Sequence, residues 1–90
     1  RNGVNAVEVT LPGHDIRFPG MTNIGTRPTF DGHCQTIETH ILGFSGNLYG
    51  QPIGLHFRCR LRDERAFSSP NELAQQMSAD AHEVKRIVGY

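Results

Sequence analysis

Apolar and polar residues alternate over most of the first two-thirds of the chain, which is the period of a half-buried β-strand. At the start, Val7, Val9 and Leu11 fall on one face, and Glu8 and Thr10 fall on the other. Such alternation is typical of antiparallel strands that leave one face in water. The predicted strands cover residues 4–11, 17–24, 36–44 and 52–61.

Turn-forming residues separate these strands. Pro12 and Gly13 end the first strand, and Pro19 with Gly20 predicts a break in the second. Residues 25–33 contain Gly, Thr, Pro and Asp, so they predict a loop. In the last strand, Leu55, Phe57, Cys59 and Leu61 are predicted to share an apolar face with Ile53.

The last third of the chain predicts one helix over residues 70–88. Ser69 can cap it, Pro70 suits the first helical position, and Glu72 completes a capping box. Gly89 is placed to end it. Its apolar stripe consists of Leu73, Met77, Ala81, Val84 and Val88. We therefore expect a small antiparallel sheet or barrel with one helix packed over it.

Length and charge narrow the class of protein. The 90 residues predict a single domain, and nine basic and nine acidic residues give a net charge of zero. Zero charge argues against bulk attraction to nucleic acid or acidic membranes. No apolar run or signal-like segment is present, which predicts no membrane contact and a cytoplasmic location. Cys34 and Cys59 lack the spacing of a zinc site and are expected to remain structural thiols.

Two segments carry side chains suited to chemistry. Glu38 and His40 share one face of a predicted strand, where a carboxylate could accept a proton from a substrate hydroxyl. Arg62, Arg65 and Phe67 follow the last strand and could form a flap over a flat, polar ligand. From the residues alone, a solvated strand face and a solvated loop remain open as alternatives.

Two further segments are less distinctive. Residues 22–30 combine hydroxyls, glycine and Arg27, which could hold an anion or form an ordinary turn. Tyr49 before Gly50 could stack on a ring, or could pack beneath a hairpin turn.

In this order and spacing, the segments resemble the riboflavin kinase family. They resemble in particular the kinase module of bacterial bifunctional riboflavin kinase/FMN adenylyltransferases (FAD synthetases), and the resemblance runs from about residue 3 to residue 88. The motifs that carry it are Asn-Ile-Gly-Thr-Arg-Pro-Thr-Phe at 23–30, Thr-Ile-Glu-Thr-His at 36–40, Asn-Leu-Tyr-Gly at 47–50, Leu-Arg-Asp-Glu-Arg-Ala-Phe at 61–67, and the helix opened by Ser69 with Asp80.

The resemblance implies a mainly β fold, namely a small antiparallel Greek-key barrel with one C-terminal α-helix. Residues 1–90 would form one partial domain, with a barrel over about 3–62, a flap loop at 62–69 and a helix at about 70–88. It also implies a reaction in which ATP, assisted by Mg²⁺, phosphorylates the 5′-hydroxyl of riboflavin to give FMN and ADP.

The resemblance also implies residue roles. Glu38 matches the catalytic glutamate, and His40 would be its neighbour. Tyr49 matches a nucleotide-contacting tyrosine. Arg62, Arg65 and Phe67 would contact the flavin, and the helix would close the pocket around the flavin ring.

One departure from the family is important. Its Pro-Thr-Ala-Asn motif, which holds Mg²⁺ and the ATP phosphates, is missing, and we assign no metal ligand because Thr29 belongs to a later loop. We therefore expect an N-terminally truncated module that is weakly active or inactive, with open sheet edges that could self-associate. An adenylyltransferase domain is expected upstream.

Two alternatives remain. The first is a non-catalytic module that binds flavin or nucleotide. The second is a nucleic-acid-binding small β-barrel with Arg58, Arg60 and Arg62 as a phosphate-binding stripe, against which the neutral charge argues.

Overall fold

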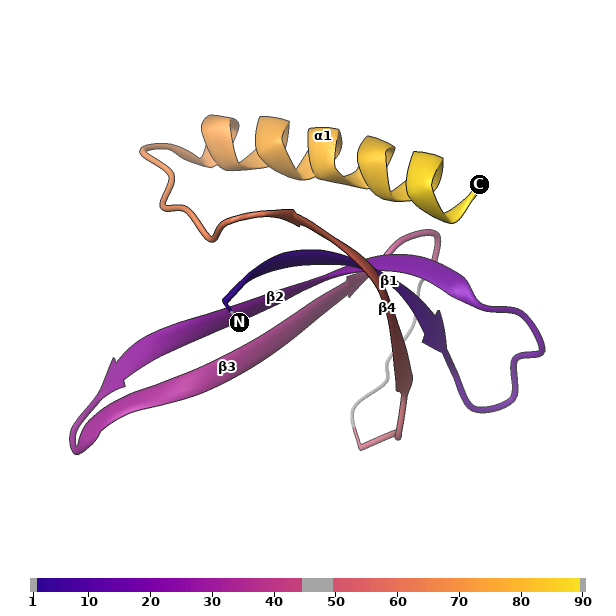
Figure 1. Cartoon of the computed structure of the whole chain (residues 1–90), viewed down its shortest axis with the longest axis horizontal. Helices are drawn as coiled ribbons and strands as arrows, with labels where there is room; N and C mark the ends of the chain where they lie inside the picture. The colour runs from indigo at the N-terminus through magenta and orange to yellow at the C-terminus, as the bar shows by residue number, and fades with distance from the viewer. Residues whose placement is uncertain (1, 45–49, 90) are drawn as a thin grey trace.

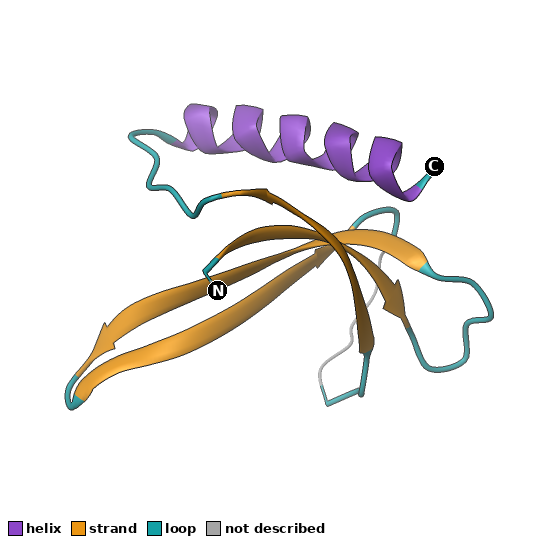
Figure 2. Ribbon diagram, in the orientation of Figure 1, coloured by secondary structure: helices purple, strands orange, loops and turns teal. Residues whose placement is uncertain are grey.

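Four antiparallel strands form a curved sheet, and one helix lies over one of its faces (Figures 1 and 2). The computed structural model describes residues 2–44 and 50–89. Its elements are β1 (Gly3–Thr10), β2 (Phe18–Thr29), β3 (Gly32–Ile41), β4 (Gly54–Arg62) and α1 (Pro70–Val88). The strand order is β3-β2-β1-β4, so the fourth strand returns to pair with the first, which is the Greek-key arrangement. The predicted fold class is confirmed, with β3 and β4 as the edges of an open sheet.

The β2–β3 hairpin corrects the prediction of a loop over residues 25–33. β2 continues to Thr29 and β3 begins at Gly32, so only Phe30 and Asp31 form the turn. The hairpin extends beyond β1, whose pairing with β2 ends at Ile24 (Figure 1). From Thr26 to Gln35 the residues on both faces of this extension are exposed, which is why its sequence lacks alternation. Pro28 is tolerated because β1 does not pair with β2 at this position.

The predicted break at Pro19 and Gly20 is also wrong. Both residues pair in register with β1, opposite Glu8 and Val7. Gly20 meets a packing requirement here, because a Cβ at this position would lie 2.9 Å from the carbonyl oxygen of His40.

β1 is a central strand and buries side chains on both faces, whereas the pattern predicted one buried face. Val4 and Ala6 pack toward α1 in a first core cluster, while Val7 and Val9 belong to a second cluster on the opposite face. The first cluster contains Val4, Ala6, Met21, Leu42 and Val84. The second contains Val7, Val9 and Leu11, covered by Phe18, Ile41, Phe44 and Leu55.

β4 does not keep the single apolar face that its sequence predicts. Its pairing with β1 shifts register twice, between Val4 and Asn5 and between Ala6 and Val7. Leu55 therefore packs in the second cluster and Leu61 against the first. Phe57, Cys59 and Cys34 are exposed, and both cysteines have free thiols.

The helix has the predicted bounds. The Ser69 hydroxyl accepts a hydrogen bond from the Glu72 N–H at 3.1 Å, and Gly89 ends the helix with φ of 90°. Val84 is fully buried, and Ala81 packs beside it. Within the described ranges, no helix is long and apolar enough to cross a bilayer.

Candidate functional site

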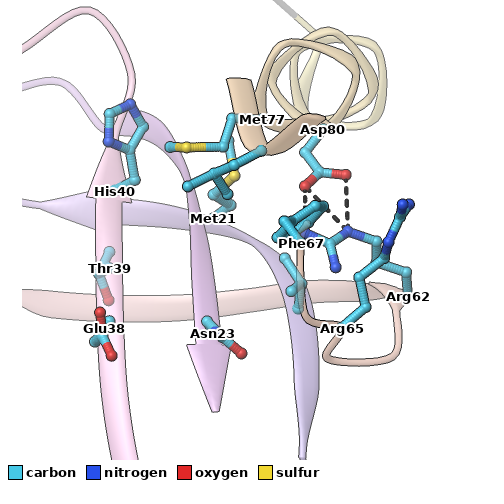
Figure 3. A pocket seen from close by; sticks show the side chains of 12 residues that line it. Met21, Asn23, Glu38, Thr39, His40, Arg62, Arg65, Phe67, Met77 and Asp80 are labelled. Atoms are coloured by element: carbon cyan, nitrogen blue, oxygen red, sulfur yellow. Dashed lines mark hydrogen bonds and ion pairs between the residues drawn. The ribbon is translucent and has the colours of Figure 1, made fainter. Parts of the chain in front are cut away.

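A cavity of about 410 Å³ lies between the α1-facing side of the sheet and the first half of the helix (Figure 3). This size is typical of small-molecule sites. Figure 3 shows Glu38 and His40 along β3 on one side, with the flap loop (residues 62–69) on the other. The cavity is lined by Val4, Met21, Asn23, Glu38, Thr39, His40, Arg62, Arg65, Phe67, Leu73, Met77 and Asp80.

Strand register brings the polar side of the cavity together. Glu38 pairs with Asn23, His40 pairs with Met21, and Asn23 also pairs with Val4 on β1. Because paired residues project from the same face of a sheet, these side chains all face the helix.

Glu38 lies near the base of the projecting hairpin, and 62% of its side chain is exposed. Its Oε1 accepts a hydrogen bond from Nη2 of Arg27 at 2.6 Å. That hydrogen bond, with the carboxylate charge, raises the pKa of the Arg27 guanidinium further above its usual value. The carboxylate is therefore held in place while remaining open to a ligand.

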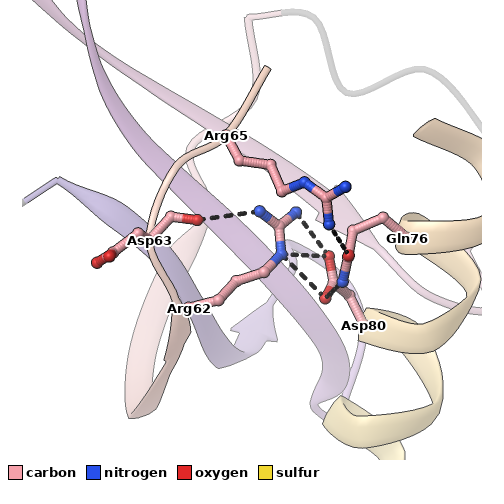
Figure 4. Close-up of polar contacts among 5 residues, drawn as sticks. All are labelled: Arg62, Asp63, Arg65, Gln76 and Asp80. Carbon is pink, nitrogen blue, oxygen red and sulfur yellow. Dashed lines mark hydrogen bonds and ion pairs between the residues drawn. The ribbon is translucent and has the colours of Figure 1, made fainter. Parts of the chain in front are cut away.

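The flap loop is fixed to the helix through Arg62 and Asp80 (Figure 4). Arg62 donates from Nη2 to Oδ2 of Asp80 at 2.8 Å and from Nε to both carboxylate oxygens at 3.1 Å. Asp80 also accepts a hydrogen bond from Gln76 at 3.0 Å. Arg62 Nη1 donates to the backbone oxygen of Asp63 at 3.0 Å.

Arg65 joins the same loop to the start of the helix. It donates to Gln76 Oε1 at 2.7 Å and to Glu72 Oε1 at 3.1 Å. Its guanidinium carbon lies 4.8 Å from the Phe67 ring centroid, and that of Arg62 lies 5.9 Å from it. Both arginines therefore hold the aromatic ring at the cavity by cation–π contact.

The first half of the helical stripe lines the cavity instead of the core. Leu73 is 41% exposed and Met77 is 37% exposed, whereas Val84 is fully buried. With Phe67 and Met21, these side chains give the cavity an apolar wall.

A second cavity of about 380 Å³ adjoins the first and is more polar. Asn23 and Arg65 line both cavities. The other residues lining the second are Thr26, Arg27, Glu64 and Ala66.

Five of the six predicted site residues gather around the first cavity. They are Glu38, His40, Arg62, Arg65 and Phe67. The sixth, Tyr49, lies outside the described residues. Among residues 2–44 and 50–89, no three His, Cys, Asp or Glu side chains group as metal ligands would.

Sequence reasoning assigned no site role to Asn23, Gln76 or Asp80. Asp80 did carry a signal, since it is an acid flanked by Met77 and Ala81 within an apolar stripe. Asn23 stood within a motif that could be an ordinary turn, so only the strand pairing reveals its place beside Glu38.

The arginines of β4 do not form a free phosphate-binding stripe. Arg58 pairs with Glu8 at 2.6 Å, and Arg60 pairs with Asp63. Arg62 pairs with Asp80, so every arginine of that stripe has an acidic partner.

Comparison with known proteins identifies the family. The flavokinase family model, described as riboflavin kinase, matches residues 1–88. The chain belongs to this family. It spans only about a quarter of the length of its curated bifunctional relatives.

Several relatives are similar over most of the chain. The bifunctional riboflavin kinase/FMN adenylyltransferase of Haemophilus influenzae is 40% identical over 83 residues, covering 92% of this chain and 27% of that protein. Its Escherichia coli K12 counterpart is 40% identical over 87 residues, covering 97% and 28%. The RNA-binding riboflavin kinase RibR of Bacillus subtilis is 33% identical over 81 residues, covering 89% and 34%.

A solved structure has the same fold. A crystal structure of a macrolide-efflux protein from Streptococcus pneumoniae superimposes with a TM-score of 0.85 at 28% identity. The match covers 93% of this chain and 27% of that one.

Proposed function

We propose that this chain is the flavin-binding part of a riboflavin kinase that converts riboflavin and ATP to FMN and ADP. Membership of the family supports the kinase class. The observation that supports this substrate is a cavity with both a carboxylate and an apolar wall. Glu38 lines it from the sheet, and Phe67, Leu73 and Met77 line it from the flap loop and the helix. Riboflavin has a matching form, with a flat ring and a hydroxylated chain.

In the proposed reaction, Glu38 acts as the base. Its carboxylate takes the proton of the 5′-hydroxyl as that oxygen bonds to the γ-phosphorus, and the bond from this phosphorus to ADP breaks. Arg27 holds the carboxylate, and His40 stands beside it on β3. The flavin ring would lie against Phe67, with Arg62 and Arg65 at its polar edge. Tyr49 would contact the nucleotide.

Magnesium would assist the transfer by neutralising phosphate charge. No three His, Cys, Asp or Glu side chains of the described residues group as metal ligands, and the sequence contains no Pro-Thr-Ala-Asn. The proposed steps therefore use none of them as a metal ligand. For the same reason, we propose that this 90-residue chain binds flavin but phosphorylates it slowly.

The relatives named as bifunctional suggest a partner within the same polypeptide. We propose that the whole protein also carries an adenylyltransferase domain.

Flavin fluorescence and chromatography test the proposal in two stages. Titration of riboflavin with the chain should quench its fluorescence, and prolonged incubation with ATP and Mg²⁺ should yield a small amount of FMN. Glu38→Gln should retain the quenching and lose the FMN. Absence of quenching would overturn the flavin site. Equal FMN from both proteins would remove Glu38 from the mechanism, and rapid turnover would overturn the proposal of slow phosphorylation.

A further inference from the structure

One oxygen of the site has a hydrogen-bonding capacity that the protein does not use. Oδ1 of Asn23 is buried, and the described residues provide no hydrogen-bond partner for it. Buried polar atoms are nearly always paired, because an unpaired one loses its hydration without compensation. His56 has a similar atom, Nε2, but it lines neither cavity.

Asn23 lies beside the proposed catalytic base. It is paired with Glu38 across β2 and β3, so the two side chains stand side by side on the cavity face (Figure 3). It also lines both cavities, at the boundary between the apolar pocket and the polar one.

We propose that Asn23 is a substrate-binding residue whose Oδ1 accepts a hydrogen bond from a hydroxyl of the ribityl chain. This inference rests on the proposed function. An acceptor requires a donor, and a hydroxyl is one, whereas an ionised phosphate offers only acceptors. A neutral carboxamide also adds no charge beside Glu38, where a second carboxylate would be repelled. The hydrogen bond would bring the neighbouring 5′-hydroxyl to Glu38.

Two flavins distinguish binding of the flavin ring from binding of the ribityl chain. Lumiflavin has the ring of riboflavin with a methyl group in place of the ribityl chain. We expect Asn23→Ala to weaken riboflavin binding by roughly 2- to 12-fold, the range of one net hydrogen bond, and to leave lumiflavin binding unchanged. Asn71→Ala is the matched control, because Asn71 is exposed on α1 and lines neither cavity.

The outcomes distinguish this inference from the proposed function. If the unaltered chain binds neither flavin, the flavin site itself fails. If the chain binds both and Asn23→Ala weakens both equally or neither, the flavin site stands and the role of Asn23 is wrong.

Thermal unfolding tests whether Oδ1 of Asn23 lacks a hydrogen-bond partner within the protein. Because Asn23→Leu removes the unpaired buried oxygen and keeps the branched shape of the side chain, its melting temperature should equal or exceed that of the unaltered protein. A clear fall would mean that the oxygen has a protein partner, which overturns the inference. Asn23→Ser, which shortens the side chain but stays polar, repeats the two-flavin comparison and should also weaken riboflavin alone.

Discussion

The carboxylate of Asp80 and the guanidinium of Arg62 form a two-pronged ion pair that joins the helix to the end of β4. The closest contact is 2.8 Å, between Nη2 and Oδ2. Asp80 has 6% of its side chain exposed and Arg62 has 22%, so neither charge is well hydrated. Such a pair fixes the flap loop in position, but breaking it leaves a partly buried charge without its partner.

Asp80→Asn should therefore destabilise the chain while keeping the shape of the side chain. We expect a loss of about 1–3 kcal/mol in the free energy of unfolding, moderated by the water that still reaches Arg62. Riboflavin binding should also weaken, because the loosened Arg62 no longer holds the flap loop and Phe67. Urea denaturation and fluorescence titration measure the two effects.

Glu83→Gln is the control for this prediction, because Glu83 pairs with Arg86 on the same helix but in solvent. Exposed pairs contribute little to stability, so its unfolding curve should match that of the unaltered chain. Equal effects of the two substitutions would contradict the assignment of Asp80 as the residue that fixes the flap loop.

Phe67 should contribute to flavin binding through its ring. Arg62 and Arg65 hold it at the cavity, where it can stack on a flat ligand. Phe67→Leu keeps most of the apolar area and loses the aromatic face. We expect roughly 2- to 12-fold weaker binding of both riboflavin and lumiflavin, measured by fluorescence quenching.

Phe30→Leu is the same chemical change at the fully exposed β2–β3 turn, far from the cavity lining. It should leave both affinities unchanged. If both variants bind like the unaltered chain, Phe67 packs beside the site without contacting the flavin.

The helix and the strand count could be predicted from sequence because their signals are local. Ser69 and Gly89 bound the helix, and alternation marks the strands. The length of the hairpin could not be predicted, since residues 26–29 are exposed on both faces and the pattern of residues 25–33 resembles a loop. The split faces of β4 depend on register shifts against β1, which no pattern within β4 encodes.

The candidate site likewise combines residues whose proximity the sequence could predict with residues whose proximity it could not. Glu38 and His40 share a strand face, so their proximity follows from period two alone. Asn23 and Asp80 reach the cavity through strand pairing and helix packing, respectively. Both are contacts between segments far apart in sequence. Of these four residues, the sequence resemblance implied roles only for Glu38 and His40, and those roles remain predictions.

Gly20 and Gly25, both on β2, allow a matched test of close packing. A Cβ at Gly20 would meet the backbone oxygen of His40 at 2.9 Å and the side chain of Val9 at 3.1 Å, neither of which can move freely. A Cβ at Gly25 would meet only the mobile end of the Glu64 side chain.

Gly20→Ala should therefore lower the free energy of unfolding by about 1–3 kcal/mol, the usual cost of overpacking. Gly25→Ala should change it by less than about 0.5 kcal/mol, because Glu64 can turn away. Urea denaturation compares the two. Equal stability of both variants would mean that β2 and β3 can separate slightly at Gly20.

Glu72 should make the flap loop sensitive to acid. The Ser68 hydroxyl donates a hydrogen bond to its carboxylate at 2.6 Å, and this bond, followed by Arg65, lowers the pKa of Glu72 below its usual value of 4.5. A carboxyl whose pKa is lower in the folded state binds fewer protons there than in the unfolded state. Its contribution to stability is therefore present above pH 4.5 and is lost as the pH falls through the lowered pKa.

Comparing Glu72→Gln with the unaltered chain isolates this contribution. At about pH 7 the variant should melt at the lower temperature, because glutamine cannot supply the charge that Ser68 and Arg65 stabilise. The difference should shrink as the pH falls below 4.5, where Glu72 itself becomes neutral. Ser68→Ala, which removes the largest cause of the shift, should reduce the same difference at neutral pH. A melting difference that stays constant down to about pH 2 would show that Glu72 acts through helix packing and not through its charge.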